Sequence, residues 1–250
     1  MPHFFIDPRS IKGNFAKIGG SDARHISSVL RLQAGDWLML SDGSGRRWRG
    51  EIVTSSPKDV LIRILALKKA APSQRPIRLC QALVKHDKFE WIVQKSVELG
   101  CSEVAPFASE RTVPKFKTGK IERWQKIAAE AAKQCGSPFV PNIGPIVTYE
   151  NLIKDIARGN KKAFLFFEGE EKVPLSKASI DNSGPLNLII GPEGGFAEQE
   201  VALAGSAGCE ACGLGPLILR VETAAIAAIA LVQYRLGYFE NNNATTYHST

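Results

Sequence analysis

Apolar runs of strand length alternate with amphipathic segments of helix length over residues 77–236. The runs IRLCQAL (77–83) and LNLII (186–190) are continuous, which is typical of strands covered on both faces. Between them the period becomes helical, as in residues 88–100. One face of that segment carries apolar side chains, namely Phe89, Ile92, Val93 and Val97. The alternation predicts an α/β domain with a mainly parallel sheet.

Residues 1–72 have a different pattern of apolar residues, with short strand-like runs and a single helical stretch. DGSG at 42–45 joins two of the runs and is typical of a hairpin turn. The helical stretch is 21–32, for which Ser21 or Asp22 is the expected N-cap. We therefore expect a small β-barrel or half-barrel over 1–72 and a second domain over 73–250. The segment between them, LKKAAPSQRP, is rich in proline, alanine and charge.

The positive charge of the chain is concentrated in the first domain. Residues 1–72 hold 12 Lys and Arg against 6 Asp and Glu, a net charge of +6, whereas residues 73–250 hold 20 against 19. This asymmetry favours a small basic module that contacts a polyanion such as RNA. A solvated basic surface without a partner is the alternative.

Several classes of protein are disfavoured by composition. No apolar run approaches the ~20 residues of a membrane span, and the first residues lack the order of a signal peptide, so we expect a cytoplasmic protein. Five widely spaced cysteines do not suggest a disulfide framework. CEAC at 209–212 lacks the two further ligands of a zinc site. We expect no bound metal and two cysteines packed near a strand.

The segment NLIIGPEGGFAEQE (187–200) places three glycines within five residues at the end of an apolar strand. Ligands of open α/β sheets bind beyond the carboxyl ends of strands. Glycines there expose backbone groups and permit positive φ, which we expect at Gly194 and Gly195. The loop lacks the lysine and hydroxyl of a P-loop, so its ligand should not be strongly anionic. A tight turn without a ligand is the alternative.

A second segment, LGPLILRVETAA (214–225), repeats the order of strand, Gly-Pro turn and helix. It carries Arg220 and Glu222. An isolated pair of this kind is most often a structural ion pair. Two Gly-Pro loops that end two strands of one sheet favour a shared binding site instead.

Together, IIGPEGGF and LGPLILRVETAA resemble the cofactor loops of the SPOUT methyltransferases, and most closely those of RsmE, a family of small-subunit ribosomal RNA uridine N3-methyltransferases. Segments at 25–36, 88–107, 109–113 and 123–134 are similar in the same order, so the resemblance covers nearly the whole chain. It implies a PUA-like RNA-binding β-barrel followed by a trefoil-knotted α/β domain with a mainly parallel sheet, and a homodimer. It also implies methylation of N3 of a specific uridine in 16S ribosomal RNA, with S-adenosyl-L-methionine (AdoMet) as cofactor.

AdoMet carries no phosphate, which suits a loop without lysine. The resemblance implies that backbone groups and side chains at three strand ends hold it, namely Phe167, Glu168, Gly191, Glu193, Gly194, Leu214, Gly215, Ile218 and Leu219. The Glu193 side chain either faces the sulfonium or ribose, or caps a backbone turn.

Uracil N3 must lose its proton during methylation, and negative charge then spreads onto the flanking carbonyl oxygens. Arg220 is the best candidate to stabilise that charge. Glu222 either orients Arg220, takes the proton, or serves only as a favourable charge at a helix start.

The candidate RNA contacts are arginines, six in the first domain and one that follows a strand end in the second: Arg9, Arg24, Arg31, Arg46, Arg47, Arg49 and Arg111. Trp48 lies among three of them and could stack on bases, although an alternating strand favours core packing. His25 is expected to be structural. The target base must leave its stack, so single-stranded or bulged RNA is expected.

Two positions depart from the family pattern. Ala197 replaces a serine that would form a capping box with Glu200, at an expected cost of about 1 kcal/mol unless another group substitutes. Ser137 replaces an arginine. A non-enzymatic RNA-binding or ribosome-assembly factor is the rival function, and a nucleotide-dependent enzyme is disfavoured by the missing P-loop lysine.

Overall fold

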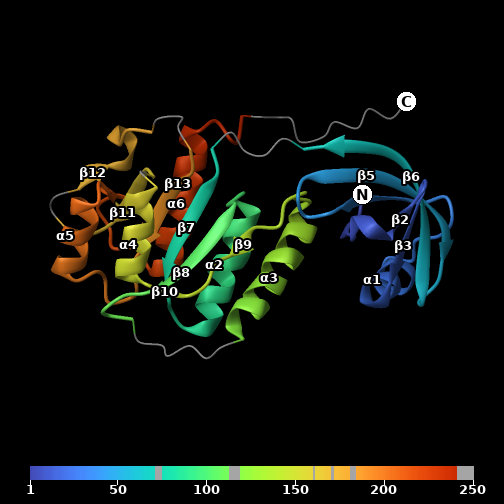
Figure 1. The fold of residues 1–250 in the computed structure, drawn as a ribbon, viewed down its shortest axis with the longest axis horizontal. Coiled ribbons are helices and arrows are strands. Elements are labelled where there is room, and N and C mark those ends of the chain that lie inside the picture. The colour runs from blue at the N-terminus through green and yellow to red at the C-terminus, as the bar shows by residue number, and fades with distance from the viewer. Residues whose placement is uncertain (71–74, 113–118, 160, 170–171, 181–183, 241–250) are drawn as a thin grey trace. The chain divides into compact units, whose positions relative to one another are not determined.

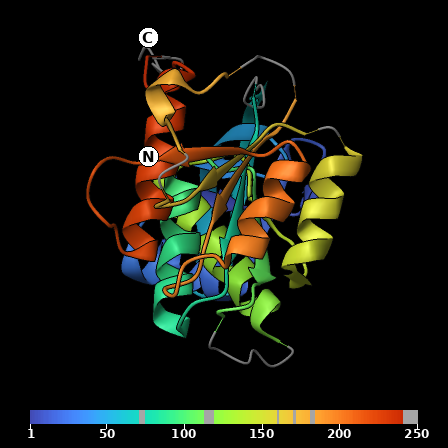
Figure 2. The same ribbon diagram turned by 90° about the vertical axis from the view of Figure 1, so that its left-hand side faces the viewer.

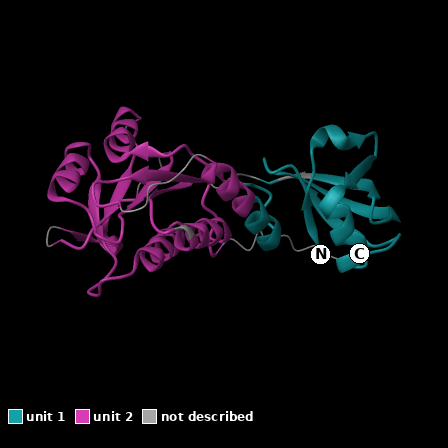
Figure 3. Cartoon of the chain, turned by 90° about the horizontal axis from the view of Figure 1, so that it is seen from below, with its two compact units in different colours: residues 1–72, 129–140 teal, residues 73–128, 141–250 magenta. Residues whose placement is uncertain are grey.

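The computed structural model describes residues 1–250 except 71–74, 113–118, 160, 170–171, 181–183 and 241–250 (Figure 1). The chain forms two compact units, one of residues 1–72 with 129–140 and one of residues 73–128 with 141–250 (Figure 3). Residues 129–140, which were expected in the second domain, pack with the first unit. Part of the expected linker, 71–74, lies outside the described residues.

The first unit is built on a six-stranded sheet in the order β1-β4-β5-β6-β3-β2. Only the β1–β4 pair is parallel. The strands are β1 (His3–Phe5), β2 (Ile11–Lys12), β3 (Phe15–Gly19), β4 (Trp37–Ser41), β5 (Arg46–Ser55) and β6 (Asp59–Lys69), with a short 3-10 turn at Pro8–Ser10. The predicted hairpin at 42–45 is confirmed, because Ser41 pairs with Arg47 across its two strands.

The predicted cap of the helical stretch is wrong. Helix α1 (Gly20–Arg24) is capped by Gly19 without a side-chain hydrogen bond and continues into a π-helical turn at His25–Val29. Asp22 is not free to cap, because Lys133 Nζ lies 2.6 Å from its Oδ1. The Lys133 ammonium also lies 4.9 Å from the centre of the Phe4 ring.

These contacts explain why residues 129–140 belong to the first unit. Their backbone is also fastened to the hairpin turn, since Gly45 N–H donates to Pro138 O and Val140 N–H to Gly43 O. Gly45 has φ +103°, and a β-carbon there would lie 2.5 Å from the Phe139 ring. Glycine is required at that close approach.

The second unit contains a parallel sheet in the order β10-β8-β7-β13-β11-β14-β12, with β9 paired to β8. The strands are β7 (Ile77–Ala82), β8 (Glu103–Ala108), β9 (Asn142–Ile143), β10 (Val147–Thr148), β11 (Ala163–Phe166), β12 (Val173–Pro174), β13 (Leu186–Ile190) and β14 (Glu210–Gly213). The predicted parallel α/β domain is confirmed.

Helices cover both faces of this sheet (Figure 2). Helices α4 (Tyr149–Arg158) and α5 (Glu198–Ser206) lie on one side, and α2 (His86–Glu98) and α6 (Val221–Arg235) lie together on the other. Helix α3 is Lys120–Cys135, and a 3-10 turn spans Leu175–Lys177. The predicted apolar face of α2 is buried, and Gly100 follows the helix with φ +79°. No described helix has the length and apolar character needed to cross a bilayer.

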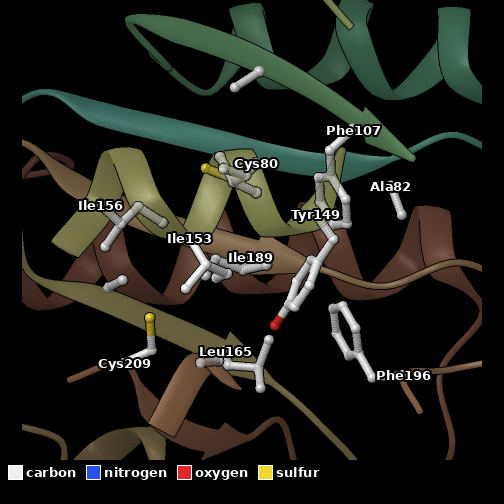
Figure 4. Packing of buried hydrophobic residues seen from close by; sticks show 14 residues of the cluster. Cys80, Ala82, Phe107, Tyr149, Ile153, Ile156, Leu165, Ile189, Phe196 and Cys209 are labelled. Carbon is white, nitrogen blue, oxygen red and sulfur yellow. The ribbon is translucent and has the colours of Figure 1, made fainter. Parts of the chain in front are cut away.

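An aromatic group anchors the carboxyl edge of the sheet to the core (Figure 4). The Phe196 ring lies 5.5 Å from the Tyr149 ring and 6.5 Å from the Phe107 ring, centre to centre. Tyr149 donates its hydroxyl to Glu200 O at 3.0 Å. Burial of a phenylalanine contributes about 1.5–3 kcal/mol, so Phe196 holds the end of the glycine-rich loop against the sheet.

Trp48 and the cysteines of the CEAC segment are buried, as the sequence predicts. Trp48 is only 7% exposed and packs in the core of the first unit, as predicted. Cys209 and Cys212 are buried free thiols beside and in β14, as expected. Burial raises the pKa of their thiols to about 11 and about 12.

Because His3 is buried, we expect the free energy of unfolding to depend on pH. Its Nε2 lies 2.7 Å from Ser41 Oγ, and burial together with the positive charges of Arg47 and Lys133 lowers its pKa from 6.5 to about 4. Between those values the unfolded chain binds a proton that the folded chain does not. Stability should therefore fall, by at most about 3 kcal/mol, as the pH drops from 6.5 to 4. Urea unfolding of the wild type and His3→Gln should diverge over this window, and parallel curves would contradict the assignment.

Candidate active site at the carboxyl edge of the parallel sheet

The predicted cofactor residues lie at the ends of three adjacent strands. Phe167 and Glu168 follow β11, residues 191–197 follow β13, and residues 214–220 follow β14. Because β13, β11 and β14 are neighbours and parallel, their carboxyl ends meet at one edge. The structure therefore brings both Gly-Pro loops to the same edge, as expected of a ligand site in this class of sheet.

Glycine is required at each of three positions in the first loop for a different structural reason. A β-carbon on Gly191 would lie 2.9 Å from the Phe196 ring, and one on Gly194 would lie 3.2 Å from Arg111 Cβ. Gly195 has φ +70° and open space around it. The expectation of positive φ is thus met at Gly195 and wrong at Gly194, where glycine accommodates a neighbouring side chain. Gly195 N–H closes the turn by donating to Pro192 O at 3.0 Å.

Lys88, which the sequence did not indicate, connects the first loop to the first turn of α6. Its Nζ lies 3.0 Å from Glu193 Oε1 and 3.8 Å from Glu222 Oε2. The hydrogen bond to Glu193 raises the pKa of the Lys88 ammonium, and the nearby charge of Arg220 lowers it slightly. Lys88 reaches the site because it lies in the first turns of α2, which follows β7, and β7 is the strand next to β13. That strand order is invisible in the sequence.

Four charged side chains therefore gather here, two carboxylates (Glu193 and Glu222) and two cations (Lys88 and Arg220). Among the described residues, Glu222 pairs with Lys88 and not with Arg220. Its Oε2 is buried yet accepts no hydrogen bond in the described structure. Glu222 also lies in the first turn of α6, where the helix dipole favours a carboxylate.

Most of the predicted cofactor residues in the second loop and after β11 are exposed or half-buried. Leu217 and Ile218 are 78% and 80% exposed, and Gly215 has φ +117° with open space around it. Phe167 is half-buried against the core that includes Phe196. Glu168 is exposed, and its carbonyl accepts a hydrogen bond from Lys172 Nζ.

The basic residues of the first unit are not equally available. Arg9 and Arg46 form ion pairs with Asp7 and Asp42, each at 2.6 Å. Arg47 Nη2 donates to Gly136 O at 2.6 Å. Arg24 and Arg31 are exposed and form no ion pair with any residue that the structure describes.

The two tryptophans of this unit also differ in exposure. The Arg49 guanidinium lies 4.0 Å from the ring centre of Trp37, which is 36% exposed. Trp37 is thus partly exposed, whereas Trp48 is buried. His25 lies edge-on to the buried Phe4 ring, in keeping with a structural role.

Comparison with known proteins identifies the family of this chain. A family model described as an RNA methyltransferase domain matches residues 71–233, and one described as an RNA methyltransferase PUA domain matches residues 18–65. Ribosomal RNA small subunit methyltransferase E of Bacillus subtilis is 31% identical over 229 residues, which are 87% of this chain and 89% of that one. The same enzyme of Synechocystis is 32% identical over 91% of this chain and 75% of that one. The chain belongs to the ribosomal RNA small subunit methyltransferase E family.

Solved structures of similar proteins extend the match to three dimensions. Ribosomal RNA small subunit methyltransferase E of Neisseria gonorrhoeae, bound to S-adenosyl methionine, has a TM-score of 0.84 and 31% identity over 94% of this chain and 98% of that one. A methyltransferase of Legionella pneumophila with bound SAM has a TM-score of 0.82 and 28% identity over 93% and 97%. The predicted family and fold class, a PUA-like domain with a SPOUT domain, are confirmed. Membership of an RNA methyltransferase family favours an enzyme over both rival functions.

In this methyltransferase, the helix cap lost through Ala197 is partly replaced by another interaction. Ala197 has no oxygen with which to cap α5, but Glu200 Oε2 accepts a hydrogen bond from Ala197 N–H at 2.9 Å. Half of the capping box therefore survives. Among the described residues, the Ser137 hydroxyl bonds to Phe139 O and N, and it does not replace a guanidinium.

Gly195 of this methyltransferase can be tested against a matched glycine. Added β-carbons at Gly195 and at Gly205 of α5 both meet open space, but only Gly195 has positive φ. Gly195→Ala should lower the free energy of unfolding by about 1–2 kcal/mol, whereas Gly205→Ala should be neutral or stabilising by up to about 1 kcal/mol. Equal effects in denaturant unfolding would show that backbone conformation does not set the requirement for glycine.

Proposed function

We propose that this methyltransferase transfers the methyl group of AdoMet to N3 of a uridine in 16S ribosomal RNA. The observation that carries the proposal is the charge balance at the shared edge of both Gly-Pro loops. Lys88 is the one lysine that reaches the described first loop, and it is already paired with Glu193 and Glu222. Such an edge suits a phosphate-free cofactor with a sulfonium and disfavours a triphosphate.

The residues present fit AdoMet. Gly195 and Gly215 have open space where side chains would be, so the backbone of both loops is accessible to a flat ligand. We assign adenine and ribose to the backbone of Gly191, Leu214, Gly215, Ile218 and Leu219. The other contacts are assigned to Phe167, Glu168, Glu193 and Gly194. Two similar proteins whose structures were solved with S-adenosyl methionine bound support the choice of this cofactor.

Two residues at the start of α6, the N-cap residue Arg220 and Glu222 of the first turn, are assigned to the chemistry. Bound AdoMet supplies an activated methyl group, so the protein must orient the base and manage its proton. Arg220 is exposed at the start of α6 and is proposed to stabilise negative charge on the uracil carbonyl oxygens. Glu222 Oε2 lies 3.8 Å from Lys88 Nζ and accepts no hydrogen bond from a described residue, and it is proposed to accept the N3 proton.

RNA binding is assigned mainly to the first domain, residues 1–72, and the transfer to residues 73–250. The exposed Arg24 and Arg31 are the strongest candidates for phosphate contacts, and Arg9, Arg46 and Arg49 are further candidates. Arg47 is a weaker one, since its guanidinium already binds Gly136 O. A base could stack on the exposed Arg49–Trp37 pair.

We also propose that the protein is a cytoplasmic homodimer. The support for a dimer is a set of exposed apolar side chains on α6 and the loop before it, namely Leu217, Ile218, Leu231 and Tyr234. Exposed apolar side chains of this size in one stretch are typical of an interaction surface. A ribosomal RNA substrate agrees with a cytoplasmic location.

The assignment of Arg220 and Glu222 predicts separable defects. Arg220→Ala should keep AdoMet affinity and slow methyl transfer by about 100- to 1,000-fold, because the charge it stabilises develops only in the transition state. Arg220→Lys should restore little, since a point charge does not reproduce the planar fork. Single-turnover rates on 16S ribosomal RNA with saturating AdoMet, and mass spectrometry of the product nucleoside, provide the measurement.

Glu222→Gln tests the base within the same assay. If Glu222 takes the proton, activity should fall steeply and recover as the pH rises toward the ionisation of uracil itself. A small loss with a pH profile parallel to the wild type would leave Glu222 as a helix-start or orienting charge. A wild-type protein that transfers no methyl group to uridine N3 would refute the proposed function.

A further inference from the structure

A short turn after β8 is fastened to the first cofactor loop. Residues 109–112 close on themselves, because Ser109 N–H donates to Thr112 Oγ1 at 2.9 Å and Thr112 N–H donates to Ser109 O at 3.0 Å. Glu110 and Arg111 lie at the tip of this turn. Both reach the segment from 194 to 200, more than 80 residues later in the chain.

The first attachment is the carboxylate of Glu200. Its Oε1 accepts a hydrogen bond from Glu110 N–H at 3.0 Å and its Oε2 accepts one from Ala197 N–H at 2.9 Å. Glu200 is only 6% exposed. A buried carboxylate needs donors of this kind, and hydrogen bonds to a charged acceptor are about twice as strong as neutral ones. One side chain therefore joins the turn to the end of the cofactor loop.

The second attachment is the guanidinium of Arg111. Its Nη1 donates to Gly194 O at 3.0 Å. The aliphatic part of the side chain also lies against Gly194, since a β-carbon there would be 3.2 Å from Arg111 Cβ. The loop is thus held from its middle, at Gly194, and from its end, at Ala197.

We propose that Arg111 and Glu200 are positioning residues that clamp the first cofactor loop in its binding conformation before the ligand arrives. This changes the role of Arg111 from a phosphate ligand to a support for the loop. The identity of the ligand rests on the proposed function, but the clamp itself does not. Preorganisation of this kind raises affinity by removing the cost of ordering the loop during binding.

The clamp is tested first in the ligand-free protein by hydrogen exchange. Arg111→Ala and the isosteric Glu200→Gln should each speed the exchange of amides within 192–197 by about tenfold or more, because each removes a charge-assisted bond. Glu200→Gln retains one acceptor but turns an NH₂ group toward the other N–H donor. Arg123→Ala is the matched control, since Arg123 is an exposed arginine of α3 that is paired with Glu90. Unchanged exchange in both variants would overturn the clamp.

The second test separates the clamp from a direct RNA contact. Arg111→Ala should weaken AdoMet binding by about tenfold in calorimetry and leave the salt dependence of RNA binding unchanged. Arg24→Ala, which removes an assigned phosphate contact, should instead lower that slope by about one unit and keep AdoMet affinity. A lower slope with normal AdoMet affinity in Arg111→Ala would return Arg111 to the RNA surface. Absence of AdoMet binding by the wild type would refute the proposed function, and hydrogen exchange would still decide the clamp.

Discussion

The parallel direction of β13, β11 and β14 is the constraint on which the site depends. Parallel neighbours deliver their carboxyl ends to one edge, so three segments far apart in sequence, 167–168, 191–197 and 214–220, emerge together. Phe196 then fixes the first of these loops to the core through its contacts with Tyr149 and Phe107. The glycines follow from this packing, since Gly191 must admit the Phe196 ring and Gly194 the Arg111 side chain.

Charge gives the site its chemical selectivity. A P-loop uses a lysine that is free to reach the phosphates of the ligand. Here the ammonium of Lys88 is shared by two carboxylates, with the closer contact to Glu193. Glu222 Oε2, which accepts no hydrogen bond from a described residue, and the exposed guanidinium of Arg220 are the groups that we assign to the substrate. This division assigns cofactor binding mainly to the backbone and chemistry to side chains.

The sequence could predict the parts of the molecule that depend on local pattern. Apolar periodicity located β7, α2, β13 and α6, and turn residues located the 42–45 hairpin. The resemblance identified the family and both Gly-Pro loops. The helices, strands and turn could be predicted because each is determined within about 15 neighbouring residues, whereas the family was identified from motifs along nearly the whole chain.

Features that depend on long-range contacts could not be predicted. Lys88 joins the site only because β7 lies beside β13. Residues 129–140 join the first unit through Lys133 and Gly136, and those contacts also take Asp22 from its cap and restrict Arg47. The positive φ at Gly195 rather than Gly194 depends on the route that the loop takes past Arg111.

The central claim is that both Gly-Pro loops form a single binding site for AdoMet. Hydrogen exchange of the wild-type protein with and without AdoMet tests it most directly. The account predicts that amides in 191–197 and in 214–220 become protected together and with the same dependence on AdoMet concentration, while ATP at equal concentration protects neither. Protection of only one loop, or equal protection by ATP, would contradict it.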